Sequence, residues 1–126
     1  MQFLLMAMED EAAFAARDDP ARAGAYWSSW THYLAALTEA GVLVGAGGLE
    51  PPGTATTVRR AAAGAYADPT VGTVVQDGPF ADTKEQLGGY FVVEVDDLDA
   101  ALGWAQRCPA LDGGSCEVRP LLPPRP

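Results

Sequence analysis

Two short segments of this chain are apolar at successive positions rather than at alternate ones. They are FLLMAM, at Phe3–Met8, and YFVVEV, at Tyr90–Val95. Because successive side chains of a strand point to opposite faces of its sheet, both faces of these two strands must be covered. Neither segment approaches the roughly 20 apolar residues of a helix that spans a bilayer. The pattern therefore predicts two central strands in the sheet of a globular domain.

Strand-like and helix-like segments alternate along the rest of the chain. Further strands are expected at Val42–Gly48, Thr54–Arg60, Val71–Val75 and from Ser115, and helices at Glu9–Arg17, from Ala21 or Gly24 to Ala40, and at Asp97–Arg107. Without the hairpin that contains Thr54–Arg60, this order is two β-α-β halves in series. It predicts an α+β ferredoxin-like sandwich with an inserted β-hairpin. We expect one domain over residues 1–126, with a loose tail at 121–126.

The long helix carries an apolar stripe and the chain's single histidine. Trp27, Trp30, Leu34 and Leu37 recur at spacings of three, four and three, which predicts that this stripe packs into the core. His32 lies two residues from Trp30, about 200° around the helix, so we expect it at the surface.

Glycines are concentrated in VLVGAGGLEPPG, at Val42–Gly53, which does not have the spacing of a dinucleotide-binding loop. Glycines inside a strand instead allow another backbone or a ligand to approach closely.

Two helices cover only one face of a four-stranded sheet, although both central strands are apolar on both faces. Something else must cover the second face, and a second copy of the chain is the simplest candidate. The sequence therefore predicts a homodimer in which sheet packs toward sheet.

The composition limits the partners of this chain. Asp and Glu number 17 against 8 Lys and Arg, which gives a formal charge of -9 and makes nucleic acids and anionic membranes poor partners. The apolar run that begins at Phe3 lacks the basic start and the length of a secretory signal, so we expect a cytoplasmic protein. With His32 and only two cysteines, Cys108 and Cys116, we expect reduced thiols, no metal site and no cofactor.

The loop DGPFADTKEQLGG, at Asp77–Gly89, admits two interpretations. In the structural one, Asp77 begins a Gly-Pro turn, and Asp82 with Glu85 forms a capping box for one helical turn at Thr83–Leu87. In the functional one, Asp77, Lys84 and Glu85 are candidate catalytic residues. The carboxylates would act as acid or base, with Lys84 as their electrostatic partner.

The run DGPFADTKEQLGGYFVVEV, followed by DDLDAALGWAQRCP and EVRPL, resembles the DGPF group of the YCII-related proteins. The resemblance covers nearly the whole chain and implies a ferredoxin-like fold in a dimeric α+β barrel. YCII relatives are thought to be enzymes with a His–Asp pair in a cleft near the dimer interface, and one branch eliminates chloride from a hydroxylated aromatic ring. Alignment on the helix end matches that histidine to Trp30 and its acid to the vicinity of Glu39. The pair is therefore not carried over.

Two functional hypotheses follow from these observations. In the first, the protein binds a small, partly apolar molecule in a dimer-interface cleft and catalyses a cofactor-independent proton transfer, elimination or isomerisation. In the alternative, it is a non-catalytic binding protein or an accessory structural dimer. The sequence does not decide whether the protein is an enzyme.

Overall fold

The computed structural model describes residues 1–61 and 72–125. The chain divides into two compact units, a sheet unit of Met1–Leu49 with Lys84–Pro126 and a hairpin unit of Glu50–Thr83. Each unit is described by itself. The loop expected at 61–69 falls, apart from its first residue, outside the described residues, as does the expected start of a strand at Val71.

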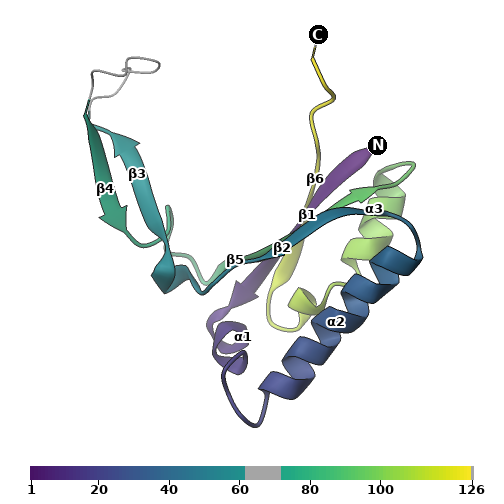
Figure 1. Cartoon of the computed structure of the whole chain (residues 1–126), viewed down its shortest axis with the longest axis horizontal. Helices are drawn as coiled ribbons and strands as arrows, with labels where there is room; N and C mark the ends of the chain where they lie inside the picture. The colour runs from purple at the N-terminus through teal and green to yellow at the C-terminus, as the bar shows by residue number, and fades with distance from the viewer. Residues whose placement is uncertain (62–71, 126) are drawn as a thin grey trace. The chain divides into compact units, whose positions relative to one another are not determined.

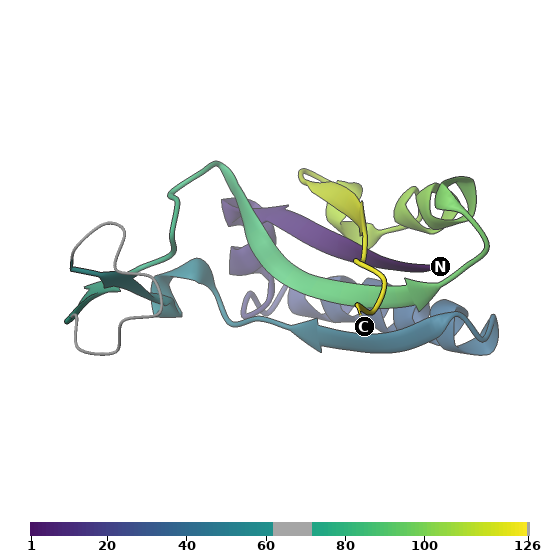
Figure 2. The ribbon, with the colours of Figure 1, turned by 90° about the horizontal axis from the view of Figure 1, so that it is seen from above.

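The sheet unit is an α+β structure with one antiparallel sheet in the order β2-β5-β1-β6. Its strands are β1 (Gln2–Asp10), β2 (Leu43–Gly48), β5 (Glu85–Glu94) and β6 (Ser115–Pro120), and its helices are α1 (Glu11–Ala16), α2 (Ala23–Glu39), α3 (Leu98–Ala105) and the short 3-10 helix η2 (Pro109–Leu111). Figure 2 shows β5 running between β1 and β2. This arrangement is compatible with the expected ferredoxin-like sandwich. Within the described part of the chain the sheet stays open and does not close into a barrel.

The helices lie on one face of this sheet (Figure 1), and the core lies between them and the strands. Phe3, Leu5 and Ala7 alternate along β1 and are almost completely buried. They pack in one cluster with Val93 of β5 and Leu37 of α2. The intervening side chains of β1 point to the other face and are only partly buried. Both expected central strands are thus confirmed as the middle pair of the sheet.

The buried stripe of α2 is displaced from the one that the sequence predicts. Tyr33 and Leu37 are buried and Trp30 packs against the core, whereas Trp27 is 49% and Leu34 40% exposed. The prediction is confirmed for Trp30 and Leu37 and was wrong for Trp27 and Leu34, because spacings of three and four fit two neighbouring stripes of the same helix equally well. Tyr33 takes the core position since its hydroxyl donates a hydrogen bond to the Trp104 carbonyl, at 2.8 Å.

The ends of the helices agree with the sequence signals. Asp97 caps α3, because its side chain accepts a hydrogen bond from the Ala100 amide at 2.9 Å. Gly41 has a φ of 72° directly after the end of α2, as expected of a glycine that ends a helix.

The hairpin unit contains the short 3-10 helix η1 (Pro52–Thr54) and the antiparallel strands β3 (Thr56–Arg60) and β4 (Thr73–Asp77). This pair confirms the inserted hairpin. Gly78, with a φ of 97°, follows β4 directly, and its amide donates to the Ala55 carbonyl at 2.7 Å. The chain bends at Gly78, whose backbone angle other residues adopt rarely, but Asp77 is still paired within β4, so a turn at Asp77-Gly78-Pro79 stays a prediction.

The prediction of a single helical turn at Thr83–Leu87 was wrong. Residues Glu85 to Leu87 are the first three of β5, and Glu85, Gln86 and Leu87 lie opposite Asp10, Glu9 and Met8 of β1. Pairing with a neighbouring strand gives these residues backbone hydrogen bonds that an isolated turn of helix supplies less well. Among the described residues, no helix has the length and apolar character needed to cross a membrane.

Candidate functional site

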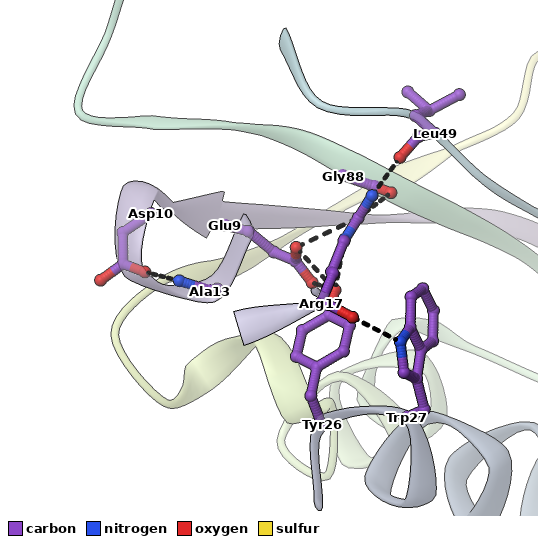
Figure 3. Close-up of polar contacts among 8 residues, drawn as sticks. All are labelled: Glu9, Asp10, Ala13, Arg17, Tyr26, Trp27, Leu49 and Gly88. Atoms are coloured by element: carbon purple, nitrogen blue, oxygen red, sulfur yellow. Dashed lines mark hydrogen bonds and ion pairs between the residues drawn. The ribbon is translucent and has the colours of Figure 1, made fainter. Parts of the chain in front are cut away.

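A buried carboxylate lies near the end of β1, where the sheet meets the helices (Figure 3). Glu9 is 2% exposed, and the Tyr26 hydroxyl oxygen lies 2.8 Å from its Oε1 and 2.9 Å from its Oε2. The Arg17 guanidinium completes the set with an ion pair of 3.3 Å between Nη2 and Oε2. Burial of a charged carboxylate is unfavourable without such partners, so Arg17 and Tyr26 are what allow Glu9 to be there.

Arg17 connects this carboxylate to three other elements. Its Nε donates to the Tyr26 hydroxyl at 3.0 Å, and its Nη groups donate to the backbone carbonyls of Leu49 and Gly88. The Trp27 indole donates to the Arg17 carbonyl at 3.2 Å. The side chain of Arg17 is consequently only 10% exposed. All the contacts lie within the sheet unit and hold the end of α1 against β5 and α2.

Gly88 and Gly89, which directly precede Tyr90, each make room for a close neighbour. The pairing of β1 with β5 shifts register after Ala7, and a Cβ at Gly88 would lie 2.8 Å from Glu9 Oε2. A Cβ at Gly89 would lie 3.1 Å from the Gly47 carbonyl oxygen, and one at Gly47 only 2.7 Å from the Tyr90 ring. Of the strand glycines at which a close approach was expected, Gly47 faces the Tyr90 side chain, whereas a Cβ at Gly45 or Gly48 would have nothing within 4 Å. Gly88 belongs to the Glu9 site.

A pocket of about 360 Å³, here named the α1–α2 pocket, opens beside this cluster. Glu9, Tyr26 and Trp30 line it from β1 and α2. The remaining lining residues are small or polar: Asp10, Ala12, Ala13, Ala16, Arg22, Ala25, Ser29, Pro109, Ala110 and Asp112. A concave site with many apolar atoms and a few converging polar groups is the usual form of a small-molecule site.

The environment of Tyr26 keeps its hydroxyl protonated. Partial burial raises the pKa of Tyr26, and the neighbouring Glu9 carboxylate raises it further, against the opposite effect of Arg17. Since the phenol stays neutral, it remains a hydrogen-bond donor to Glu9. A neutral hydroxyl and a carboxylate that share a hydrogen bond beside a pocket form a pair through which a proton can pass.

We expect the stability of the fold to decline in alkaline solution. Burial also raises the pKa of Tyr33, as it does that of Tyr26, so both pKa values in the folded chain exceed the value of about 10 for an exposed tyrosine. The stabilisation is complete below about pH 10 and is lost as the pH rises toward the folded values. Urea unfolding should show this loss as the pH rises above about 10. The loss should be smaller in Tyr33→Phe, and an equal loss would contradict the assignment.

The three predicted site residues lie in both units of the chain. Asp77 ends β4 in the hairpin unit, opposite Thr56. Lys84 and Glu85 belong to the sheet unit, where Glu85 begins β5 and its Oε1 accepts a hydrogen bond from Ser115 Oγ at 2.6 Å. Lys84 and Glu85 are therefore adjacent in the chain and in the same unit, whereas Asp77 belongs to the other unit. A catalytic role for any of the three stays a prediction.

Three substitutions in the loop separate these roles. We expect Asp77→Asn to lower the free energy of unfolding, because Asp77 directly precedes the bend at Gly78. Lys84→Ala and Glu85→Gln should weaken ligand binding if these side chains line a site. Urea unfolding and titration with a ligand found by screening measure the two effects. If all three variants lose only stability, the catalytic interpretation of the loop fails.

Sequence reasoning missed Glu9, Arg17 and Tyr26. One signal was available: Glu9 continues the odd-numbered series of Phe3, Leu5 and Ala7, which is the buried face of β1. An acid at such a position needs a buried partner, and that requirement points to a polar cluster.

Two further predictions concern the positions of Trp30 and His32 on α2. Trp30 does belong to the core, since its ring stacks on Phe91 with centroids 5.9 Å apart, but it also lines the α1–α2 pocket. His32 is exposed, as predicted, and its Nδ1 lies 3.4 Å from Ser28 Oγ.

Comparison with known proteins agrees with this fold. The model of the YCII-related domain matches residues 1–125, nearly the whole chain. The chain belongs to the YCII-related family. It is similar to the uncharacterised protein R00369 of Rhizobium meliloti (strain 1021), with 41% identity over 85 residues. The match covers 66% of this chain and 62% of that relative, so the chain spans less than two thirds of the relative's length. Membership of the DGPF group stays a prediction.

The resemblance matches the histidine of the YCII relatives to a residue of α2 in this YCII-related chain. That position is Trp30, which lines the α1–α2 pocket, whereas Glu39 is exposed at the end of α2. The pocket is instead lined by the buried Glu9 carboxylate and by Tyr26, which contacts it. In residues 1–61 and 72–125 there is no group of three or more His, Cys, Asp or Glu residues that could hold a metal ion.

Proposed function

We propose that this YCII-related protein binds a small, partly apolar molecule in the α1–α2 pocket and exchanges a proton with it. One observation carries the proposal: the buried Glu9 carboxylate and the neutral Tyr26 hydroxyl share a hydrogen bond and line the same pocket. The small side chains around them would contact the apolar part of the ligand. Proton transfer, elimination and isomerisation all need an acid and a base close to the substrate, and the two side chains supply both without a cofactor.

The proton would move through a short path. The Tyr26 hydroxyl passes its proton to Glu9 Oε1 and takes one from the bound molecule, so the carboxylate gains a proton, the molecule loses one and the hydroxyl stays neutral. Arg17 donates hydrogen bonds to both groups and holds them in place for this exchange. Because Arg17 is held by two backbone carbonyls, this arrangement is fixed before the ligand arrives.

The alternative is a binding protein without catalysis, and paired variants distinguish the two. A thermal-shift screen against small metabolites identifies ligands, since a molecule that binds only the folded state raises the melting temperature. NMR shifts of residues in α2 and η2 then locate the bound molecule. If Tyr26→Phe retains the ligand but abolishes its conversion, the protein is an enzyme. Ligands that shift no signal from the α1–α2 pocket would refute the proposal.

Glu85 is a second candidate for the same site. It lies opposite Asp10 in the β1–β5 ladder, and Asp10 lines the α1–α2 pocket. A ligand that extends past Asp10 would come within reach of Glu85 and of its neighbour Lys84.

We propose in addition that the protein is a homodimer, in which two sheets pack into an α+β barrel. Leu4, Met6, Tyr90 and Val92 lie on the sheet face opposite the helices, with Leu4 opposite Val92 and Met6 opposite Tyr90. These apolar side chains are partly buried or exposed within one chain. A second copy would bury them, and obligate interfaces of this kind commonly cover about 2,000 Å² or more. Residues of one chain form the α1–α2 pocket, so the pocket itself does not depend on the dimer.

Sedimentation should therefore give about twice the 13.2 kDa mass of one chain at micromolar concentration. Met6→Lys should shift the equilibrium toward the monomer, because the interface would bury an unpaired charge. His32→Lys, on the exposed side of α2, is the control and should leave the mass unchanged. A well-folded monomer of the original chain at high concentration would contradict the dimer.

A further inference from the structure

We infer that the ligand of the α1–α2 pocket carries a positive charge, as a small amine with an apolar body does, and is not a carboxylate or a phosphate. This inference rests on the proposed function, because it names the chemical class of the molecule bound at the same site. It follows from the charges that line the pocket, from the partners those charges already have, and from the aromatic wall.

The acids of the pocket outnumber its bases. Glu9, Asp10 and Asp112 line it, and Arg22 is the only basic residue that does so in the described part of the chain. The Arg22 guanidinium is already paired with Asp19, at 3.0 Å. Arg17 likewise is paired with Glu9. Both guanidinium groups near the pocket are therefore neutralised by carboxylates, which leaves the charges of Asp10 and Asp112 to set the sign of its field.

These two carboxylates stand at the ends of short elements that flank the pocket. Asp10 precedes α1, and its Oδ1 accepts the Ala13 amide at 2.9 Å. Asp112 follows η2, whose Pro109 and Ala110 also line the pocket. An anionic ligand would approach both carboxylates without a free cation to receive it. The formal charge of -9 on the whole chain adds to this repulsion and favours the approach of cations.

The apolar surfaces of the pocket suit the rest of such a molecule. Trp30 is held firmly, because its ring stacks on Phe91 with an angle of 13° between the planes. Tyr26 lies edge-on to Trp30, with centroids 6.4 Å apart. Aromatic rings attract ammonium groups and also pack against apolar groups. A pocket of about 360 Å³ is at the small end of the range for ligand sites, so the molecule must be small.

Three probes of one shape and different charge test the inference: benzylamine, benzyl alcohol and benzoate. Each is titrated into the labelled protein while NMR signals of Glu9–Ala13, Arg22–Trp30 and Pro109–Asp112 are followed. Benzylamine should bind roughly three- to tenfold more tightly than benzyl alcohol, as expected of a partly exposed charge contact. Benzoate should bind most weakly. Added salt should weaken the binding of benzylamine and leave that of benzyl alcohol unchanged.

Asp112→Asn supplies the matched variant, because it removes a charge and keeps the shape of the side chain. It should lower the affinity for benzylamine about two- to fivefold and leave that for benzyl alcohol unchanged. Asp99→Asn, on an exposed residue of α3 that does not line the pocket, is the control and should change neither affinity.

The outcomes separate this inference from the proposed function. If benzyl alcohol or benzoate binds in the pocket as tightly as benzylamine, or if Asp112→Asn has no effect, the positive charge of the ligand is refuted while the binding site stands. If none of the three probes shifts the signals of the pocket, and the metabolite screen finds no ligand there, both the inference and the proposed function fall.

Discussion

Replacing Arg17 with methionine should lower the free energy of unfolding by about 3–5 kcal/mol, the range for removing one partner of a buried ion pair. Methionine keeps the length and much of the apolar stem of the side chain but leaves Glu9, at 2% exposure, without its counter-charge. It also removes the donors to the carbonyls of Leu49 and Gly88. Urea unfolding followed by circular dichroism measures the loss.

Arg22→Met is the matched control for this prediction. Arg22 also forms an ion pair with an acid, Asp19, but its side chain is 50% exposed and that of Asp19 is 34% exposed. Exposed pairs of this kind contribute about 0–1 kcal/mol, so Arg22→Met should change stability little. Adding Glu9→Gln to Arg17→Met should restore part of the loss, because the second change removes the unpaired charge. Equal effects of the two arginine substitutions would show that burial of the Glu9 pair is unimportant.

The main lines of the fold could be predicted because they depend on local patterns. Apolar residues at successive positions identified Phe3–Met8 and Tyr90–Val95 as the central strands, and both are. The order of elements then left few ways to connect them. The two strands of the hairpin were expected at Thr54–Arg60 and Val71–Val75 and lie at Thr56–Arg60 and Thr73–Asp77. The bounds differ by about two residues, which is the usual uncertainty of element ends.

Predictions failed where a contact between distant segments decided the conformation. The capping pattern at Asp82 and Glu85 favours a helical turn locally, but β1 offers a partner for residues 85–87, and strand pairing prevails. The stripe of α2 could not be fixed because tryptophans at positions 27 and 30 fit two stripes. Only contact with Phe91 and the core selects Trp30 and Tyr33 over Trp27 and Leu34.

The candidate site was missed for the same physical reason. Glu9, Arg17 and Tyr26 come from a strand end, a helix end and the start of a second helix, and no spacing rule joins them. Pro20 lies between the two expected helices at Glu9–Arg17 and from Ala21 or Gly24, and a proline there is consistent with a break between them. The direction in which the chain turns there was not apparent, although this turn brings Arg17 against Tyr26. By contrast, the sequence does show that Glu9 shares a face of β1 with Phe3, Leu5 and Ala7.

Trp30→Ala should lower the free energy of unfolding by about 3 kcal/mol, the lower end of the range for removing a large aromatic side chain from a core. Trp30 is partly buried, stacks on Phe91 and meets Tyr33 and Tyr26 edge-on, so truncation removes three aromatic contacts and enlarges the α1–α2 pocket. The lower end applies because the space left behind adjoins a pocket that already admits solvent. The same change should also weaken any ligand that packs on the indole ring, measured by titration at a temperature at which the variant is folded.

Trp27→Ala is the control, since it removes the same side chain from the same helix. Trp27 is 49% exposed and does not line the α1–α2 pocket. Its side chain donates a hydrogen bond to the Arg17 carbonyl, meets Tyr26 edge-on and lies under the Arg17 guanidinium. Because these contacts are partly exposed, their loss should lower stability by only about 1 kcal/mol. If Trp27→Ala proved the more destabilising of the two, the stripe first expected from the sequence would be the one that holds α2 to the sheet. Trp30 would then act only as a wall of the pocket.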